Sequence, residues 1–170
     1  MGKHAAYFLF LGVFYPTFFY LAATFNSSTD ESSFLSLKSQ ITFNQNNILS
    51  TNWSPGTSFC TWIGVTCSQR HPKAIGLNLF NMGLQGTIPQ EIDNLSFLTY
   101  LDLSHNNFTS LIPDEIGNLI RRRMLNISDN KLSSHIPNNV GLLRNFQRLD
   151  LSVNQVIGTI PWSKFNLSSL

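Results

Sequence analysis

From about residue 74 onward, the chain repeats one pattern of hydrophobic and polar positions every 24 residues. Four segments align without gaps, namely LNLFNMGLQGTIPQEIDNL, LDLSHNNFTSLIPDEIGNL, LNISDNKLSSHIPNNVGLL and LDLSVNQVIGTIPWSKFNL. Each begins with leucine, has an aliphatic residue two positions later, and carries an Ile-Pro pair further on. A fixed spacing of this kind indicates a solenoid, in which each repeat packs only against its neighbours.

Each repeat predicts three local elements. The Leu-x-Leu alternation has the period of two that lets a short strand bury one face. A following polar column should turn the chain inward and bond backbone groups; it holds Asn106, Asn130 and Asn154, with Met82 in the first repeat. The prolines stop strand or helix, and a convex segment such as 90–95 then returns the chain with Ile92 and Leu95 in the core.

A generic α/β domain with parallel strands is the alternative to a solenoid. Crossover helices in such a domain need longer helical segments without proline. The fixed 24-residue phase, with proline in one column, therefore favours the solenoid.

The first 25 residues differ from the rest of the chain. Lys3 and His4 precede an uncharged, apolar stretch over residues 5–25 that ends in small residues. This order is typical of a secretory signal peptide, with cleavage expected just after Ala23. Its 21 uncharged residues are also long enough to remain as a membrane anchor, and Pro16 favours cleavage.

Export would place the two cysteines, Cys60 and Cys67, in an oxidising compartment. We expect them to form one disulfide, which would stabilise the fold by about 2 to 3 kcal/mol. A zinc site is the competing interpretation, but no second cysteine pair or nearby histidine pair would complete it.

Export also makes the Asn-x-Ser/Thr sequons candidates for glycosylation. Six are present, at Asn26, Asn52, Asn94, Asn107, Asn126 and Asn166. The repeat places Asn94 and Asn166 in one convex column and Asn126 on a concave strand. The glycosylation candidates are Asn52, Asn94, Asn107 and Asn166. Among them we expect glycans at Asn94 and Asn166. We expect the sequon at Asn126 either to be empty or to mark a non-binding stretch of the surface.

Composition and charge argue against a nucleic-acid partner. The 170 residues include 11 basic and 9 acidic side chains, for a net charge of +2. The run at 121–123 holds three arginines, but the repeat places Arg122 in the otherwise apolar column of Leu98 and Phe146. The run is therefore interpreted as one break in a core column beside two surface charges.

We find no pattern that predicts an enzyme. The sequence lacks a Gly-x-Ser-x-Gly elbow, a His-Glu-x-x-His motif, a phosphate-binding glycine loop and a kinase signature. His71, His105 and His135 are too far apart in sequence to suggest a local site. We expect no catalytic, cofactor or metal site.

Over residues 74–170 the unit resembles the plant extracellular leucine-rich repeat, L-x-x-L-x-L-x-x-N-x-L-x-G-x-I-P. The preceding segment resembles the amino-terminal cap of plant leucine-rich-repeat receptor-like kinases and receptor-like proteins. Its matching features are an acidic start, the motif C-x-W-x-G-V-x-C from Cys60 to Cys67, Trp53, and an expected helix containing Phe34, Leu35, Leu37, Lys38 and Ile41. In a solenoid such a cap seals the apolar end of the array.

The resemblance implies an α/β solenoid: a right-handed superhelix with a parallel concave sheet and a helical amino-terminal cap. It divides the chain into a signal peptide or anchor (1–25), a cap (26–73) and four repeats (74–170). Residue 170 falls just ahead of the next expected strand, so we expect the array to be truncated there. Any kinase domain would lie beyond that residue.

The resemblance further implies a concave surface that recognises a peptide or protein ligand, with a co-receptor as a possible further partner. The outward strand positions are the ligand-facing candidates: Tyr100, Asp102, Ser104, His105, Met124, Asn126, Ser128, Asp129, Arg148, Asp150, Ser152 and Val153. A cell-surface receptor segment in defence or developmental signalling is the expected function. A secreted binder resembling polygalacturonase-inhibiting proteins, or a small structural co-receptor, is the alternative. Contact with the membrane would come from a missing downstream part or a retained anchor.

Overall fold

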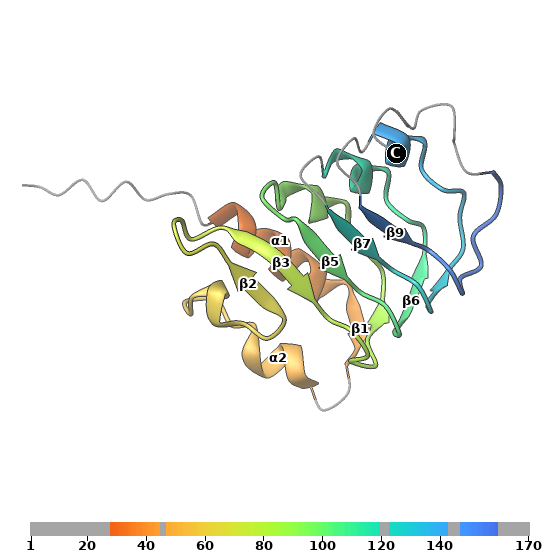
Figure 1. Ribbon diagram of the computed structural model, residues 1–170. Coiled ribbons are helices and arrows are strands. Elements are labelled where there is room, and N and C mark those ends of the chain that lie inside the picture. The colour runs from red at the N-terminus through yellow and green to blue at the C-terminus, as the bar shows by residue number, and fades with distance from the viewer. Residues whose placement is uncertain (1–27, 45–46, 120–122, 143–146, 160–170) are drawn as a thin grey trace, which may run out of the picture.

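A computed structural model describes residues 28–44, 47–119, 123–142 and 147–159 (Figure 1). The expected signal peptide, Arg122, and the sequons at Asn26 and Asn166 lie outside these residues. Within them, no helix is long and apolar enough to cross a membrane.

The described chain forms two sheets and a row of short helices. The first sheet contains β2 (Val65–Cys67), β3 (Ala74–Asn78), β5 (Tyr100–Asp102), β7 (Met124–Asn126) and β9 (Arg148–Asp150). The second contains β1 (Ile41–Phe43), β4 (Gln85–Gly86), β6 (Asn107–Ser110) and β8 (Lys131–Leu132). The helices are α1 (Ser28–Ser39), α2 (Ile48–Asn52) and the 3-10 helices η2 (Phe59–Thr61), η3 (Gln90–Asn94), η4 (Asp114–Asn118) and η5 (Asn138–Leu142).

The first sheet, here called the concave sheet, confirms the predicted repeat. Leu77 pairs with Leu101, Leu101 with Leu125, and Leu125 with Leu149, all between parallel strands. Neighbouring strands thus lie in the 24-residue register of the sequence. Figure 1 shows β3, β5, β7 and β9 side by side in chain order.

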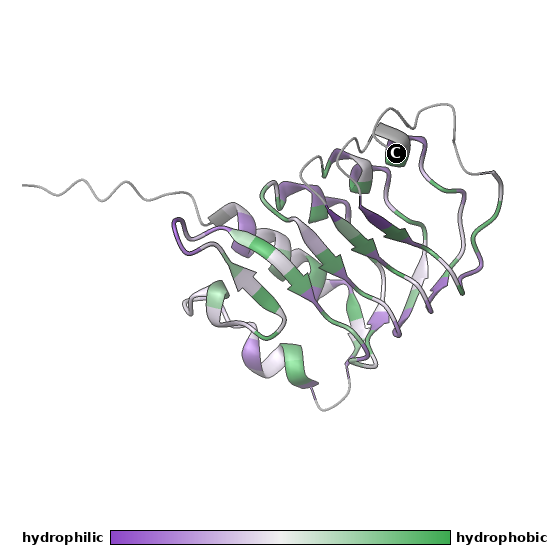
Figure 2. Cartoon of the chain, in the orientation of Figure 1, coloured by the Kyte–Doolittle hydropathy of each residue, from purple (hydrophilic) through white to green (hydrophobic). Residues whose placement is uncertain are grey.

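The repeated aliphatic columns form the core. Leu77, Leu101 and Leu125 are fully buried, and so are Ile92 and Leu95 from the convex segment, as the repeat predicts. Figure 2 shows hydrophobic positions along β5 and β7, and the central leucine of each strand faces the core. Burial of these columns supplies the main driving force for stacking the repeats.

The second sheet was not predicted from the sequence. The pairs β4–β6 and β6–β8 are parallel, and β1 from the cap pairs antiparallel with β4. Its repeat strands β4 and β8 have only two residues each, which is too short to show an alternation of hydrophobic positions. The sheet follows from stacking of the repeats rather than from a local strand signal.

An aromatic cluster and a disulfide build the amino-terminal cap. Trp53 is fully buried, with its ring stacked on Trp62 at 5.6 Å between centroids. Phe34 of α1 meets the edge of Trp53 at 5.4 Å. The expected disulfide between Cys60 and Cys67 is confirmed.

Two details of α1 differ from the sequence interpretation. The helix ends at Ser39, so the expected placement of Ile41 in it is wrong; Ile41 begins β1 and pairs with Gly86. Asp30, in the acidic start of the cap, does more than begin the helix, because its buried carboxylate accepts a hydrogen bond from the Ala74 N–H at 2.9 Å. It also pairs with Lys73 Nζ at 3.2 Å, which ties the cap to the first repeat.

Candidate functional site

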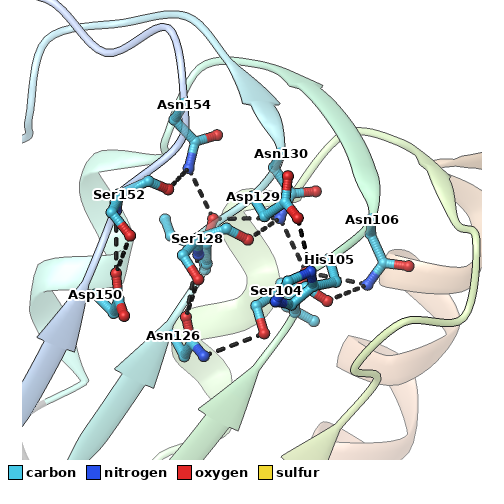
Figure 3. A network of polar contacts seen from close by, with 12 residues as sticks. Ser104, His105, Asn106, Asn126, Ser128, Asp129, Asn130, Asp150, Ser152 and Asn154 are labelled. Atoms are coloured by element: carbon cyan, nitrogen blue, oxygen red, sulfur yellow. Dashed lines mark hydrogen bonds and ion pairs between the residues drawn. The ribbon is translucent and has the colours of Figure 1, made fainter.

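The exits of the concave strands carry a continuous network of polar side chains (Figure 3). The chain must leave each strand and turn toward the core there, which leaves backbone groups without strand partners. Buried backbone groups need hydrogen-bond partners, and side chains in this network supply them. The network therefore decides which strand residues can face a ligand.

The predicted asparagine column forms a ladder along the solenoid. Asn130 accepts a hydrogen bond at Oδ1 from the Phe108 N–H at 2.9 Å. Its Nδ2 donates to carbonyl oxygens of Leu103, Ile127 and Ser128. Asn106 and Asn154 make the equivalent bonds in the adjacent repeats. Each asparagine thus joins its own repeat to the preceding one.

A second set of bonds closes the turn at each strand end. Asp150 Oδ1 accepts from both the N–H and the hydroxyl of Ser152, at 3.1 and 2.6 Å. The pairs Asp102 with Ser104 and Asn126 with Ser128 repeat this arrangement. Adjacent turns are also linked, because Asn126 Nδ2 donates to Ser104 Oγ at 3.1 Å.

These bonds change the list of ligand-facing candidates. Ser104 is 0% exposed, and Asp102 and Ser128 are also buried, so these three predicted ligand-facing side chains are not accessible to a ligand. Asn126, Asp150 and Ser152 are more open, but their side chains are used in the turns. These six candidates shape the strand exits. The other six are accessible: Tyr100, His105, Met124, Asp129, Arg148 and Val153.

Three accessible candidates form one column across the concave sheet. Tyr100 pairs with Met124, and Met124 with Arg148, in adjacent parallel strands. The Tyr100 hydroxyl donates to Asp102 Oδ2 at 3.2 Å. Burial, with added charge repulsion and hydrogen bonding from Asp102, raises the pKa of Tyr100 above 10.0, so it remains a neutral donor at physiological pH. The column combines an aromatic, a flexible thioether and a cation.

The accessible candidates at the strand exits form a second group. His105 Nδ1 lies 2.6 Å from Asp129 Oδ2, with each side chain 50% exposed. The exposed Phe80 ring meets His105 edge-on at 5.0 Å. Phe80 was not predicted from the sequence. Its column holds serine in the other three repeats, so an aromatic residue there could have indicated a contact site.

Backbone geometry at this exit is unusual in every repeat. Asn81, His105, Asp129 and Val153 all have positive φ, between 50° and 55°. Asn and Asp tolerate this left-handed region, whereas a β-branched residue is strained there. Val153, at φ 52°, is therefore the strained member of the column.

We expect Val153→Asn to raise the free energy of unfolding by about 1 kcal/mol, because Asn relieves that strain. Val153 is 70% exposed, so little apolar burial is lost. Urea denaturation followed by circular dichroism measures the change. Ile157→Asn is the control, since Ile157 is also exposed but does not have positive φ; equal effects of the two substitutions would contradict the strain argument.

The Asp150 turn predicts a pH dependence. Hydrogen bonds from Ser152, with a smaller contribution from Arg148, lower the pKa of Asp150 below 3.8. The bonded, ionised form therefore stabilises the fold above pH 3.8, and this contribution is lost as the pH falls through the lowered value. Asp150→Asn should flatten the fall in melting temperature over that range while keeping the turn, as Asn126 does. Asp114→Asn controls for loss of one surface charge; the same flattening there would contradict the assignment.

The sequons differ in their surroundings, and this leads to a prediction about glycans. Asn94 is exposed at the end of η3, whereas the Asn126 Nδ2, the atom that would carry a glycan, already donates to Ser104. Asn52 is exposed, and Asn107 is half-buried in β6. We expect occupancy at Asn94 and none at Asn126. Glycopeptide mass spectrometry of the secreted chain that found the reverse would contradict this.

The described residues contain no group of three or more His, Cys, Asp or Glu side chains placed to hold a metal ion. The site therefore consists of the two concave groups: the column Tyr100, Met124 and Arg148, and the exit group Phe80, His105 and Asp129. These groups offer surface recognition by shape, hydrogen bonding and charge.

Comparisons with known proteins agree with this architecture. A model of the leucine-rich repeat N-terminal domain matches residues 27–68, and a leucine-rich repeat model matches 97–119 and 123–143. The chain is 42% identical over 88 residues to the LRR receptor-like serine/threonine-protein kinase EFR of Arabidopsis thaliana. That alignment covers 52% of this chain and 8% of the kinase, so the chain spans a small part of this relative's length.

Solved structures show the same solenoid. The BIR2 ectodomain from Arabidopsis thaliana superimposes with a TM-score of 0.73 at 31% identity, covering 81% of this chain and 74% of that one. The ectodomain of GASSHO1/SCHENGEN3, solved with CASPARIAN STRIP INTEGRITY FACTOR 2, gives 0.70 at 29% identity, covering 82% and 17%. The fold is a capped leucine-rich-repeat solenoid. The chain belongs to the plant leucine-rich-repeat proteins of the receptor kinase and receptor-like class.

Proposed function

We propose that this chain recognises a peptide or protein ligand on its concave sheet, as part of a plant cell-surface receptor. The column Tyr100, Met124 and Arg148 carries the proposal. It places apolar contact area, a neutral hydroxyl donor and a cation on adjacent strands with fixed spacing. Aromatic, Met and Arg side chains are the residue types enriched at protein interfaces.

The polar network at the strand exits supports recognition by a preformed surface. The asparagine ladder and the bonds that close the turns hold the strand exits through hydrogen bonds between repeats, so the backbone that carries the column needs little reordering when a ligand binds. Preorganisation of this kind lowers the entropic cost of association. A long ligand would contact the column and the His105–Asp129 pair together, since both lie on the concave side.

We further propose that this activity takes place on the secretory route and at the cell surface, in defence or developmental signalling; the similarity to plant receptor ectodomains supports this. A similar solved structure, that of the plant peptide hormone receptor RGFR1, is in complex with RGF2, which supports a peptide or protein as the ligand class. A kinase would act downstream of recognition and is no part of the activity proposed for these residues.

A second candidate is a small co-receptor ectodomain that binds another receptor. The observation that favours it is a solved neighbour, the BIR3–SERK2 complex from Arabidopsis thaliana, in which two proteins associate; its TM-score is 0.57 at 29% identity. Co-purification of the secreted chain with a second leucine-rich-repeat ectodomain, without any added peptide, would select this function over peptide recognition.

Peptide selection on the secreted chain tests the leading proposal. A phage-displayed peptide library is selected on wild type, and the enriched peptides are measured against Tyr100→Ala and Arg148→Ala. We expect at least about a tenfold loss of affinity in each, as truncation of a central aromatic or Arg contact produces. Gln69→Ala, exposed in the cap, is the control. Unchanged affinity in both column variants would overturn the proposal.

A further inference from the structure

A groove of about 660 Å³ lies on the flank of the solenoid, away from the concave column. Its lining comes from the ends of the second-sheet strands and from the start of η4, and it includes residues of all four repeats, from Thr87 to Ile157. Parallel strands stack about 4.8 Å apart, so four repeats span about 15 Å. That length matches an extended segment of about four or five residues.

Two exposed aliphatic side chains line this groove where the repeat normally has polar residues. Leu111 is 63% exposed, and its column holds Thr87 and Thr159 in other repeats. Ile157 is 58% exposed, in a column that is otherwise polar: Gln85, Thr109 and Ser133. Stacking the repeats does not require these side chains to be apolar, because the other repeats stack with polar residues at both places.

The backbone beside Leu111 also departs from the pattern. Ser110 has a φ of 72°, in the column where Gly86 and Gly158 supply positive φ. A residue other than Gly, Asn or Asp is uncommon in this region, and such outliers concentrate at ligand-binding segments. Ser110 lines the groove together with Leu111.

The groove also carries negative charge. Asp114 and Glu115, at the start of η4, both line it. Neither forms a salt bridge with another residue in the described part of the chain. The lining contains no Lys or Arg, so the two carboxylates are the charges that a bound segment would meet, apart from His135 if it is protonated.

We propose that this groove is a second interaction surface, which binds an extended segment of a partner protein carrying an aliphatic side chain close to a Lys or Arg. The aliphatic side chain packs on Leu111 and Ile157, and the cation lies against Asp114 and Glu115. Because the charged groups of the groove are carboxylates, charge complementarity favours a basic segment as the bound partner. This surface is separate from the concave column, so one chain can hold a ligand and a partner at once.

A peptide selection separates this site from the concave sheet. A phage-displayed hexapeptide library is selected on the secreted full chain carrying Tyr100→Ala and Arg148→Ala, so that the concave column is disabled. We expect enriched peptides that combine Leu, Ile or Val with Lys or Arg. Their affinity should fall at least about tenfold in Leu111→Thr and in the double variant Asp114→Asn, Glu115→Gln.

Controls keep the test independent of folding and of the concave site. Leu111→Thr installs the residue found at Thr87, and near-ultraviolet circular dichroism checks that the fold is kept. Peptides whose binding survives both groove variants would overturn the proposal, and so would enrichment of acidic peptides. Sedimentation velocity tests whether a second copy of the chain occupies the groove instead. A wild-type dimer that Leu111→Thr converts to a monomer would assign the groove to that second copy and overturn the proposal of a basic partner segment.

Discussion

Asn130→Ala is expected to lower the free energy of unfolding by about 3 kcal/mol. The substitution removes four hydrogen bonds and leaves the buried N–H of Phe108 without its partner, whereas the Leu103 carbonyl keeps the bond from Asn106. An unsatisfied buried polar group costs about 1 to 3 kcal/mol, and the three other lost hydrogen bonds add to this cost, which gives this magnitude. Urea denaturation monitored by circular dichroism measures the loss.

Position in the array supplies the matched control. Asn154 makes the equivalent bonds, but it lies one repeat further along and is more exposed, so water can replace part of what it provides. Asn154→Ala should therefore cost clearly less than Asn130→Ala. Equal costs, or a neutral Asn130→Ala, would mean that the ladder does not stabilise the stacked repeats.

Trp53→Ala should be the most damaging single change in the cap, with a loss of about 4 kcal/mol. The indole is fully buried, packs on Phe34 and Trp62, and donates its Nε1–H to the Ile63 carbonyl at 3.0 Å. Phe43→Ala, at an exposed aromatic of β1, should be near neutral. Differential scanning calorimetry of the two variants measures the contrast.

The location of the damage tests the role of the cap. Each repeat contacts only its neighbours, so loss of Trp53 should first loosen β3, the strand that follows the cap, and reach β9 last. Hydrogen exchange of backbone amides reports this order. If β9 lost protection before β3 in Trp53→Ala, the cap would not be sealing the amino end of the array.

Much of the fold could be predicted because the same pattern of core and turn residues occurs in each of the four repeats. Leucine columns, ladder asparagines and convex apolar residues recur at one spacing, and Leu101, Asn106 and Ile92 occupy the predicted places. The second sheet could not be predicted, since strands such as Gln85–Gly86 are two residues long and mostly polar. Their pairing appears only after the repeats stack.

The candidate site was predicted less completely, because hydrogen bonds in the turns bury some of the residues that were expected to face a ligand. Alternation along a strand predicts which side chains point away from the core, but it does not predict which neighbouring side chains then cover them. Ser104 and Asp102 leave the core side and then bond to each other, so they are buried without joining the apolar core. Asp30 is a similar case, because its partner, the Ala74 N–H, lies 44 residues away in sequence.

Methyl NMR of methionine tests the central claim, ligand recognition on the concave sheet, most directly. Met124 lies in the concave column, whereas Met82 lies in the ladder column and packs against the core, so it is an internal control. The secreted chain, labelled with 13C-methyl methionine, is titrated with a peptide selected on wild type. The account predicts that the Met124 methyl resonance shifts while that of Met82 stays in place. A bound peptide that leaves Met124 unmoved would contradict recognition by this column.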